Sequence, residues 1–225
     1  MIMESGAREE ILGRLRKVPR SSVGDRPEMP PLKELSLGRE EMIATFTGKL
    51  TAEEGVVHRV GDGGEAVARL TEIAAEEKLE RVMVSADEVI APLDLPRWGK
   101  ERGIEILTPA DFSDRDSFRD AVFDDAQAGI TGADYAVAES GTLVIAHDAR
   151  QPRLVSLAPV LHIALVPVER MVAVYEQAVE KMYGDGGEIP SQVSFITGPS
   201  MTADIQGRPF KGMHGPRRLV VILIG

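Results

Sequence analysis

ITGADYAVAESGTLVI, residues 130–145, is the stretch that says most about the fold. Its Ile, Val, Ala and Leu residues are typical of a buried strand, yet it also carries two carboxylates, Asp134 and Glu139. A carboxylate inside a strand costs several kcal/mol unless it is paired or lies at a solvated cleft. A bend at residues 132–134 would place Asp134 at the mouth of the strand and leave Glu139 within it. This pattern predicts the rim of an active site.

Two further features bear on that prediction. Gly141 follows Glu139 closely, and a glycine there lets a ligand or another backbone approach. The alternative is a purely structural one, in which Glu139 forms an internal salt bridge, for instance with Arg153 or Arg217. The residues alone leave both interpretations open.

Short apolar runs alternate with helical patterns on both sides of this stretch. Such alternation favours an α/β fold, with an open and mainly parallel sheet flanked by helices on both faces. The strand of residues 135–147 either bends or pairs with itself at Ser140 and Gly141. Strands are predicted at residues 56–60, 81–86, 104–109, 135–147, 162–167, 192–197 and 217–225, and helices at 39–50, 65–78, 117–127 and 170–182.

The N-terminal segment differs in composition from the rest. Residues 7–17 have the spacing of a short amphipathic helix, and residues 19–38 are rich in Pro, Ser and Gly, which indicates an extended arm. We therefore predict a helix and arm at 1–37 and a single α/β domain at 38–225. The arm could support a homodimer.

Composition excludes several classes of function. The net charge of -10 argues against a nucleic-acid backbone as ligand, because phosphate contact needs a basic face. The chain has no cysteine, so it cannot ligate an iron–sulfur cluster through thiolates. No apolar run approaches the roughly 20 residues of a membrane helix. The first residues lack the apolar region of a secretory signal. We expect a cytoplasmic protein without a membrane span.

Glycine and histidine motifs give weaker signals. GDGGEA at residues 61–66 lies between a predicted strand and a helix, and we interpret it as a plain turn rather than a dinucleotide site. The four histidines show no metal-ligand spacing, so no metal site is predicted. His162 is interpreted as a hydrogen-bonded core residue. His214 lies between two glycines, and its assignment to a turn or to a site stays open.

GPSMTADI, residues 198–205, follows a predicted buried strand. Gly198 allows a sharp exit, and Ser200 or Thr202 can cap a following helix. A strand that runs into a helix N-terminus is where open α/β sheets bind anions. A well-capped helix without a ligand is the alternative, but Asp204 stands too late in the motif for capping alone.

The same motifs carry a resemblance. ITGADYAVAESGTLVI, APVLHIALVP, ITGPSMTADI and GMHGPRRLVVILIG resemble, in this order, the lactate utilisation protein C family of LUD-domain proteins. The resemblance implies the fold of ribose-phosphate isomerases and CoA-transferases. It also implies a role in oxidising L-lactate to pyruvate beside partner subunits that are iron–sulfur oxidoreductases. Because this chain has no cysteine, the clusters are expected on those partners and no cofactor is expected here.

The resemblance also suggests roles for individual residues. Glu139 loosely resembles the nucleophilic glutamate of CoA-transferases, so we predict it as nucleophile or general base, with Asp134 orienting the substrate. A small carboxylate or phosphate is the expected ligand. The predicted ligand-binding residues are Thr131, Gly132, Ser140, Gly141, Thr142, Gly198, Ser200, Thr202, Asp204, His214 and Arg217.

Three functions stay open at this stage. The first is a component of an L-lactate oxidation system that lacks an iron–sulfur cluster and has a small-anion-binding cleft. The second is a stand-alone enzyme that acts on CoA esters or sugar phosphates through Glu139. The third is a ligand-sensing protein of the same fold.

Overall fold

The computed structural model describes residues 5–17, 35–184, 190, 192–202 and 210–225, in two compact units, 1–32 and 33–225. In the first unit, helix α1 (Ser5–Lys17) confirms the helix predicted at residues 7–17. Ile11 and Leu15 are exposed on it. The domain boundary near residue 38 and the homodimer stay predictions.

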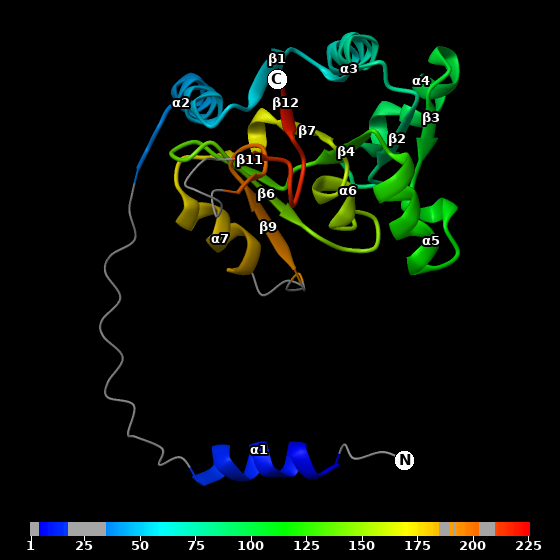
Figure 1. Cartoon of the computed structure of the whole chain (residues 1–225). Coiled ribbons are helices and arrows are strands. Elements are labelled where there is room, and N and C mark those ends of the chain that lie inside the picture. Colours follow the sequence, from blue (N-terminus) through cyan, green and yellow to red (C-terminus); the bar gives the residue numbers. More distant parts are fainter. Residues whose placement is uncertain (1–4, 18–34, 185–189, 191, 203–209) are drawn as a thin grey trace. The chain divides into compact units, whose positions relative to one another are not determined.

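The second unit is built on a sheet of six strands that all run parallel (Figure 1). Their order across the sheet is β1-β12-β7-β4-β2-β3, so the first and last strands of the chain are neighbours. This confirms the predicted α/β class with a mainly parallel sheet. The strands are β1 (Val56–Val60), β2 (Arg81–Val84), β3 (Glu105–Leu107), β4 (Ala128–Gly132), β7 (Leu161–Pro167) and β12 (Arg218–Ile224).

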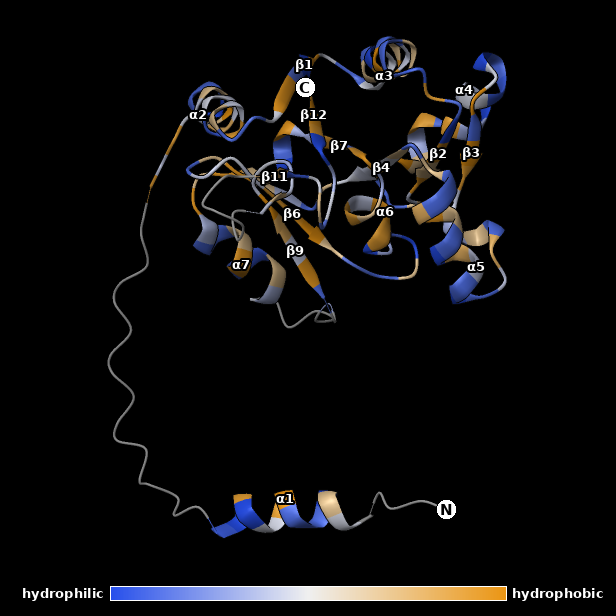
Figure 2. Ribbon diagram, in the orientation of Figure 1, coloured by the Kyte–Doolittle hydropathy of each residue, from blue (hydrophilic) through white to orange (hydrophobic). Residues whose placement is uncertain are grey.

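Both faces of the parallel sheet are covered, because side chains alternate between them. In β7, Ile163 packs into the core beneath α3 (Gly63–Glu77) and α4 (Leu95–Arg102), whereas Ala164 packs into the core beneath α2 (Arg39–Ala52). Figure 2 shows hydrophobic residues concentrated on the buried strands such as β7 and β12. The other helical segments are α5 (Arg115–Asp120), α6 (Leu154–Leu157), α7 (Tyr175–Tyr183), a π-helical turn (Ala121–Asp125) and 3-10 turns at Ala91–Leu93, Pro109–Asp111 and Val168–Arg170.

A second, mixed sheet packs on the α2 side of the parallel sheet, and α7 covers its outer face. Its order is β8-β5-β6-β9, and β5 pairs antiparallel with β6. A third, two-stranded sheet joins β10 to β11. The strands are β5 (Tyr135–Val137), β6 (Thr142–Ala146), β8 (Met171–Val172), β9 (Val193–Ile196), β10 (Met201–Thr202) and β11 (Phe210–Lys211).

The stretch at residues 130–145 supplies strands to two sheets. It leaves the parallel sheet at the end of β4, and after residues 133–134 it forms the β5–β6 hairpin. Of the two conformations predicted at Ser140 and Gly141, pairing is the one observed. Gly141 has φ +68, and a Cβ there would lie 2.6 Å from the backbone nitrogen of Leu50. Glycine is therefore required by the turn and by its contact with α2.

The GDGGEA motif is a helix start. Asp62 is the N-cap of α3, and its Oδ1 accepts a hydrogen bond from the Glu65 amide at 2.9 Å. Glu65 reaches back, and its Oε2 accepts from the Gly61 amide at 2.7 Å. These reciprocal bonds satisfy amides at the start of the helix. They agree with the interpretation of this motif as a turn.

Three elements differ from the prediction. The helix predicted at residues 170–182 begins only at Tyr175, because Met171 and Val172 form β8 and pair with β5. The strand predicted at residues 192–197 belongs to the mixed sheet, where it pairs antiparallel with β6. Met201 and Thr202 form β10 instead of the first turn of a helix, so the predicted capping by Ser200 is wrong. A helix capped by Thr202 would lie outside the described residues.

Candidate functional site

A cavity of about 530 Å³ lies where the connections of the parallel sheet change direction. After β2 the chain continues to β3 on one side, whereas the next strand of this sheet after β4 is β7 on the other side. Ligands of open α/β sheets bind at the carboxyl ends of strands at such a point. Asp87 follows β2 and Asp134 follows β4, and both line this cavity, which we call the switch-point cavity.

Asp87 anchors the floor of the switch-point cavity. The residue is 8% exposed, and its carboxylate accepts hydrogen bonds from the Ser85 hydroxyl, from the Val89 and Ile90 amides, and from the Gly132 amide at 2.9 Å. A Cβ at Gly132 would lie 2.3 Å from Asp87 Oδ1. The glycine thus admits a buried carboxylate beside β4.

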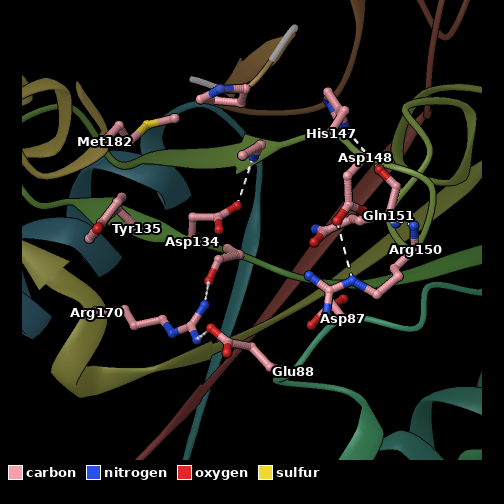
Figure 3. A pocket seen from close by; sticks show the side chains of 13 residues that line it. Asp87, Glu88, Asp134, Tyr135, His147, Asp148, Arg150, Gln151, Arg170 and Met182 are labelled. Carbon is pink, nitrogen blue, oxygen red and sulfur yellow. Dashed lines mark hydrogen bonds and ion pairs between the residues drawn. The ribbon is translucent and has the colours of Figure 1, made fainter. Parts of the chain in front are cut away.

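Asp134 is the carboxyl group suited to proton transfer in this cavity. Its Oδ2 accepts a hydrogen bond from the Ala146 amide at 2.7 Å. Burial raises the pKa of Asp134, although that hydrogen bond and the charge of Arg170 act in the opposite direction. In Figure 3 the carboxyl group lies in the middle of the cavity residues, between Tyr135 and Asp148. A carboxyl with a raised pKa in a cleft is a candidate general acid or base.

Two arginines supply positive charge at the same cavity. Arg170 donates to the Ala133 carbonyl at 3.2 Å and to the Glu88 carboxylate. The Arg150 Nε donates to Asp148 at 3.3 Å. A guanidinium has five N–H donors, so each arginine keeps donors beyond these bonds. Arg170 and Arg150 can therefore contact a carboxylate ligand while they stay paired.

His147 connects the switch-point cavity to the mixed sheet. Its Nδ1 lies 3.2 Å from the Gln151 carbonyl, and its Nε2 lies 2.7 Å from the Ser194 hydroxyl on β9. Burial lowers the pKa of His147. The neutral ring therefore links the cavity wall to β9 through two hydrogen bonds.

A second cavity, of about 220 Å³, lies between the two sheets. We call it the His162 cavity, because His162 of β7 forms part of its wall. No Asp or Glu occurs among the described residues that line it, in contrast to the switch-point cavity. Its polar lining residues are Ser156, His162, Thr197, Ser200 and His214.

His162 is buried and incompletely hydrogen-bonded. Its Nε2 lies 2.9 Å from the Thr131 hydroxyl, but its Nδ1 has no hydrogen-bond partner among the described residues. Burial lowers the pKa of His162 to about 3, with a smaller contribution from His147. An unsatisfied buried polar atom costs about 1–3 kcal/mol.

The structure brings part of the predicted ligand set to the His162 cavity. Gly198, Ser200 and His214 line it directly, and Thr131 contacts it through His162. A row of hydroxyl groups leads to it from the β5–β6 turn. Ser140 Oγ lies 2.7 Å from Thr142 Oγ1, which lies 2.9 Å from the hydroxyl of the lining residue Thr197.

Glu139 lies elsewhere. It is in the turn between β5 and β6, so the expectation that it stays within a strand is wrong. Its Oε1 accepts a hydrogen bond from the Tyr175 amide at 3.0 Å, at the first residue of α7. A carboxylate there stabilises a helix start. Glu139 is not among the described residues that line either cavity, and its role as nucleophile stays a prediction.

The other predicted residues are dispersed. Thr202 belongs to β10, the Arg217 side chain packs over Gly212, and Asp204 lies outside the described residues. The predicted single cleft is thus divided between two cavities. The sequence analysis did not predict the further residues of the switch-point cavity. Only Asp87 could have been identified from the sequence, because it directly follows a predicted strand. Those residues are Asp87, Glu88, His147, Asp148, Arg150, Gln151 and Arg170.

Two features are absent from the described residues. They contain no group of three or more His, Cys, Asp or Glu side chains arranged to hold a metal ion. Their helices also include none with the length and apolar character needed to cross a membrane.

Comparison with known proteins gives a consistent result. A profile of the LUD domain matches residues 43–224. Lactate utilization protein C of Deinococcus radiodurans is 30% identical over 220 residues, which is 96% of each chain. Lactate utilization protein C of Oceanobacillus iheyensis is 38% identical over 102 residues, 44% of each chain.

A solved structure supports the fold. It is the crystal structure of a DUF162 family protein from Deinococcus radiodurans, which is 22% identical to this chain and superposes with a TM-score of 0.62. The match covers 84% of this chain and all of the other.

Proposed function

The chain belongs to the LUD-domain family, and on this premise we propose that it is a component of an L-lactate oxidation system that carries no iron–sulfur cluster itself. The observation that carries the proposal is the family match, which extends over residues 43–224 and includes relatives called lactate utilization protein C. The lactate role comes from the names of those relatives.

The composition of the chain supports the assignment of electron transfer to other subunits of such a system. Oxidation of a 2-hydroxy acid to a 2-oxo acid removes a hydride equivalent and a proton. This chain has no cysteine with which to ligate a cluster. We therefore assign electron transfer to iron–sulfur oxidoreductase subunits that act as its partners.

The switch-point cavity is the site that we propose for a small carboxylate ligand. Its place at the carboxyl ends of β2 and β4 is the expected ligand position for this kind of sheet. Arg170 and Arg150 supply donors for a carboxylate. In this proposal Asp134, whose pKa is raised by burial, exchanges a proton with the hydroxyl or carbonyl group of the same ligand.

The test is growth on L-lactate of a strain that lacks this gene. Complementation with the wild-type gene should restore growth and L-lactate-dependent respiration. Asp134→Asn should restore neither, because the amide cannot exchange the proton, although it can still accept the bond from the Ala146 amide. Asp124→Asn, at an exposed aspartate outside both cavities, is the matched control and should behave as wild type.

The outcomes separate two parts of the proposal. If the deletion strain respires L-lactate normally, the lactate role is wrong. If the strain has the defect but Asp134→Asn complements it fully, the lactate role stands and the assignment of proton transfer to Asp134 is wrong. Soluble variant protein should be quantified in each strain, so that loss of the protein is not mistaken for loss of function.

A further inference from the structure

We infer that the switch-point cavity binds a carboxylate ligand together with one proton, and that Asp134 is the group that takes up this proton. The inference rests on the proposed carboxylate site and adds to it the protonation state of the bound complex. It starts from the charges of the cavity wall, where four carboxylates stand beside two guanidinium groups among the described lining residues. A ligand anion adds a fifth negative charge to this wall.

Three of the four carboxylates have the partners that an ionised group needs. Asp87 is buried and accepts four hydrogen bonds, from one hydroxyl group and three backbone amides. Glu88 pairs with Arg170, and its side chain is 74% exposed. Asp148 pairs with Arg150, and its side chain is 51% exposed. Hydrogen bonds, opposite charges and contact with water all favour the charged form of a carboxyl group.

Asp134 has the least compensation for a negative charge. It is half-buried, and among the described residues it accepts one hydrogen bond, from the Ala146 amide to Oδ2. Burial raises the pKa of Asp134, and the negative charges of Asp87 and Glu88 act in the same direction. The bond from the Ala146 amide and the charge of Arg170 oppose them. Asp134 is therefore the carboxyl group of the wall that takes up a proton most readily.

A bound anion makes the ionised form of Asp134 less favourable still. Figure 3 shows the Asp134 carboxyl group in the middle of the lining side chains, where a ligand of the cavity would lie. Two neighbouring carboxylates in a confined site disfavour each other's charge, so the anion raises the pKa of Asp134. An anion that accepts hydrogen bonds from Arg170 also offsets the positive charge that lowers this pKa. The proton is carried at Oδ1, because Oδ2 keeps its bond from the Ala146 amide.

The other titratable and charged side chains of the wall come from β5 and from the segments after β2, β6 and β7. They are Asp87, Glu88, Tyr135, His147, Asp148, Arg150 and Arg170. Of these, only His147 has an ordinary pKa close to neutral pH. Burial lowers the pKa of His147, and both of its ring nitrogens are already hydrogen-bonded. The imidazole therefore stays neutral while Asp134 titrates.

The test is isothermal titration calorimetry of the full-length protein with L-lactate and with acetate, in two cationic buffers of different ionisation enthalpy. A proton taken up on binding comes from the buffer, so the measured enthalpies in the two buffers differ in proportion to the uptake. At pH 7 we expect an uptake of about half a proton to one proton per anion. By linkage, Kd should then be about threefold to tenfold lower at pH 6 than at pH 7. L-lactamide, the uncharged amide of the same acid, should cause no proton uptake.

Two variants locate the proton. Asp134→Asn should bind L-lactate without proton uptake and with the same Kd at pH 6 and pH 7, because an amide does not titrate in this range. Asp124→Asn, at an exposed aspartate outside both cavities, is the matched control and should keep the uptake of the wild type. In the wild-type protein, the ¹³C resonance of the Asp134 carboxyl group should move toward its protonated position when L-lactate is added. This measurement needs no variant.

The outcomes separate the inference from the proposed function. If neither anion binds, the carboxylate site is wrong and the inference is wrong with it. If L-lactate binds without proton uptake, the inference is wrong and the carboxylate site stands. Uptake that persists in Asp134→Asn, as it would if His147 were the acceptor, overturns the assignment to Asp134. An unchanged ¹³C resonance of Asp134 or an equal uptake with L-lactamide would overturn it as well.

Discussion

In the switch-point cavity the buried carboxylate of Asp87 accepts four hydrogen bonds from the protein, whereas in the His162 cavity the buried imidazole leaves one nitrogen without a described partner. The first cavity mixes charges of both signs, and its arginines are already paired with Glu88 and Asp148. The second has no carboxylate among its described lining residues.

This difference predicts that the two regions respond differently to a ligand and to pH. A ligand of the switch-point cavity would meet arginines that are already paired with carboxylates and would use their remaining N–H donors, so geometry and proton transfer decide its binding. The His162 cavity instead contains a buried ring whose protonation the fold disfavours, so pH decides how this region contributes to stability. Three variants test this comparison.

The largest expected effect is on acid stability. The folded-state pKa of His162 is lowered to about 3, below the unfolded value of about 6.5, so the unfolded state takes up the proton first as the pH falls. Stability is therefore lost between these two values, by at most about 5 kcal/mol. His162→Gln should flatten this dependence in denaturant titrations over that range. The exposed His214→Gln is the control, and an equally steep acid loss in His162→Gln would contradict a neutral buried ring.

Asp87 gives the next effect. Asp87→Ala leaves its four donors without their acceptor in a buried position, which should cost about 3 kcal/mol in the free energy of unfolding. Asp148→Ala removes an exposed acceptor that water can replace, so we expect a loss of less than about 1 kcal/mol. Urea titrations of both variants measure the difference. Equal losses would mean that the floor of the switch-point cavity is no better ordered than its rim.

The smallest effect is expected at Asp134. Because burial raises its pKa, the stability contributed by Asp134 is present at low pH and decreases as the pH rises through that pKa. Asp134→Asn removes the cost of ionisation and keeps the bond from the Ala146 amide. Its stability at pH 7 should thus match or slightly exceed that of the wild type, within about 1 kcal/mol. A clear destabilisation at pH 7 would show that Asp134 is needed ionised.

The sequence was sufficient for the parallel sheet, because its strands are short runs of Val, Ile and Leu between helical patterns. The sequence did not decide between helix and strand where the same apolar pattern is compatible with both. Met171, Val174 and Ala178 keep a helical spacing, yet Met171 lies in β8 and the helix starts at Tyr175. A buried strand and a buried helix both require apolar residues, and the pairing partner β5 lies far away in the sequence.

The site was predicted in part for a similar reason. A bend after β4 could be read from Gly132 and Asp134, because a carboxylate there needs a cleft. The capping of α7 by Glu139 could not be predicted from the sequence, because it depends on where that helix begins. The unsatisfied nitrogen of His162 was equally hidden, because β9 and residues 214–216 complete the wall around it.

The position of β12 has a consequence for synthesis of the protein on the ribosome. β12 lies between β1 and β7, and β1 pairs only with β12 among the described strands. Strand β1 therefore has no neighbour in the sheet until residues 218–224 have left the ribosomal exit tunnel. During that interval the edges of β1 and β7 that β12 covers stay unpaired, and an unpaired strand edge makes a nascent chain prone to aggregation.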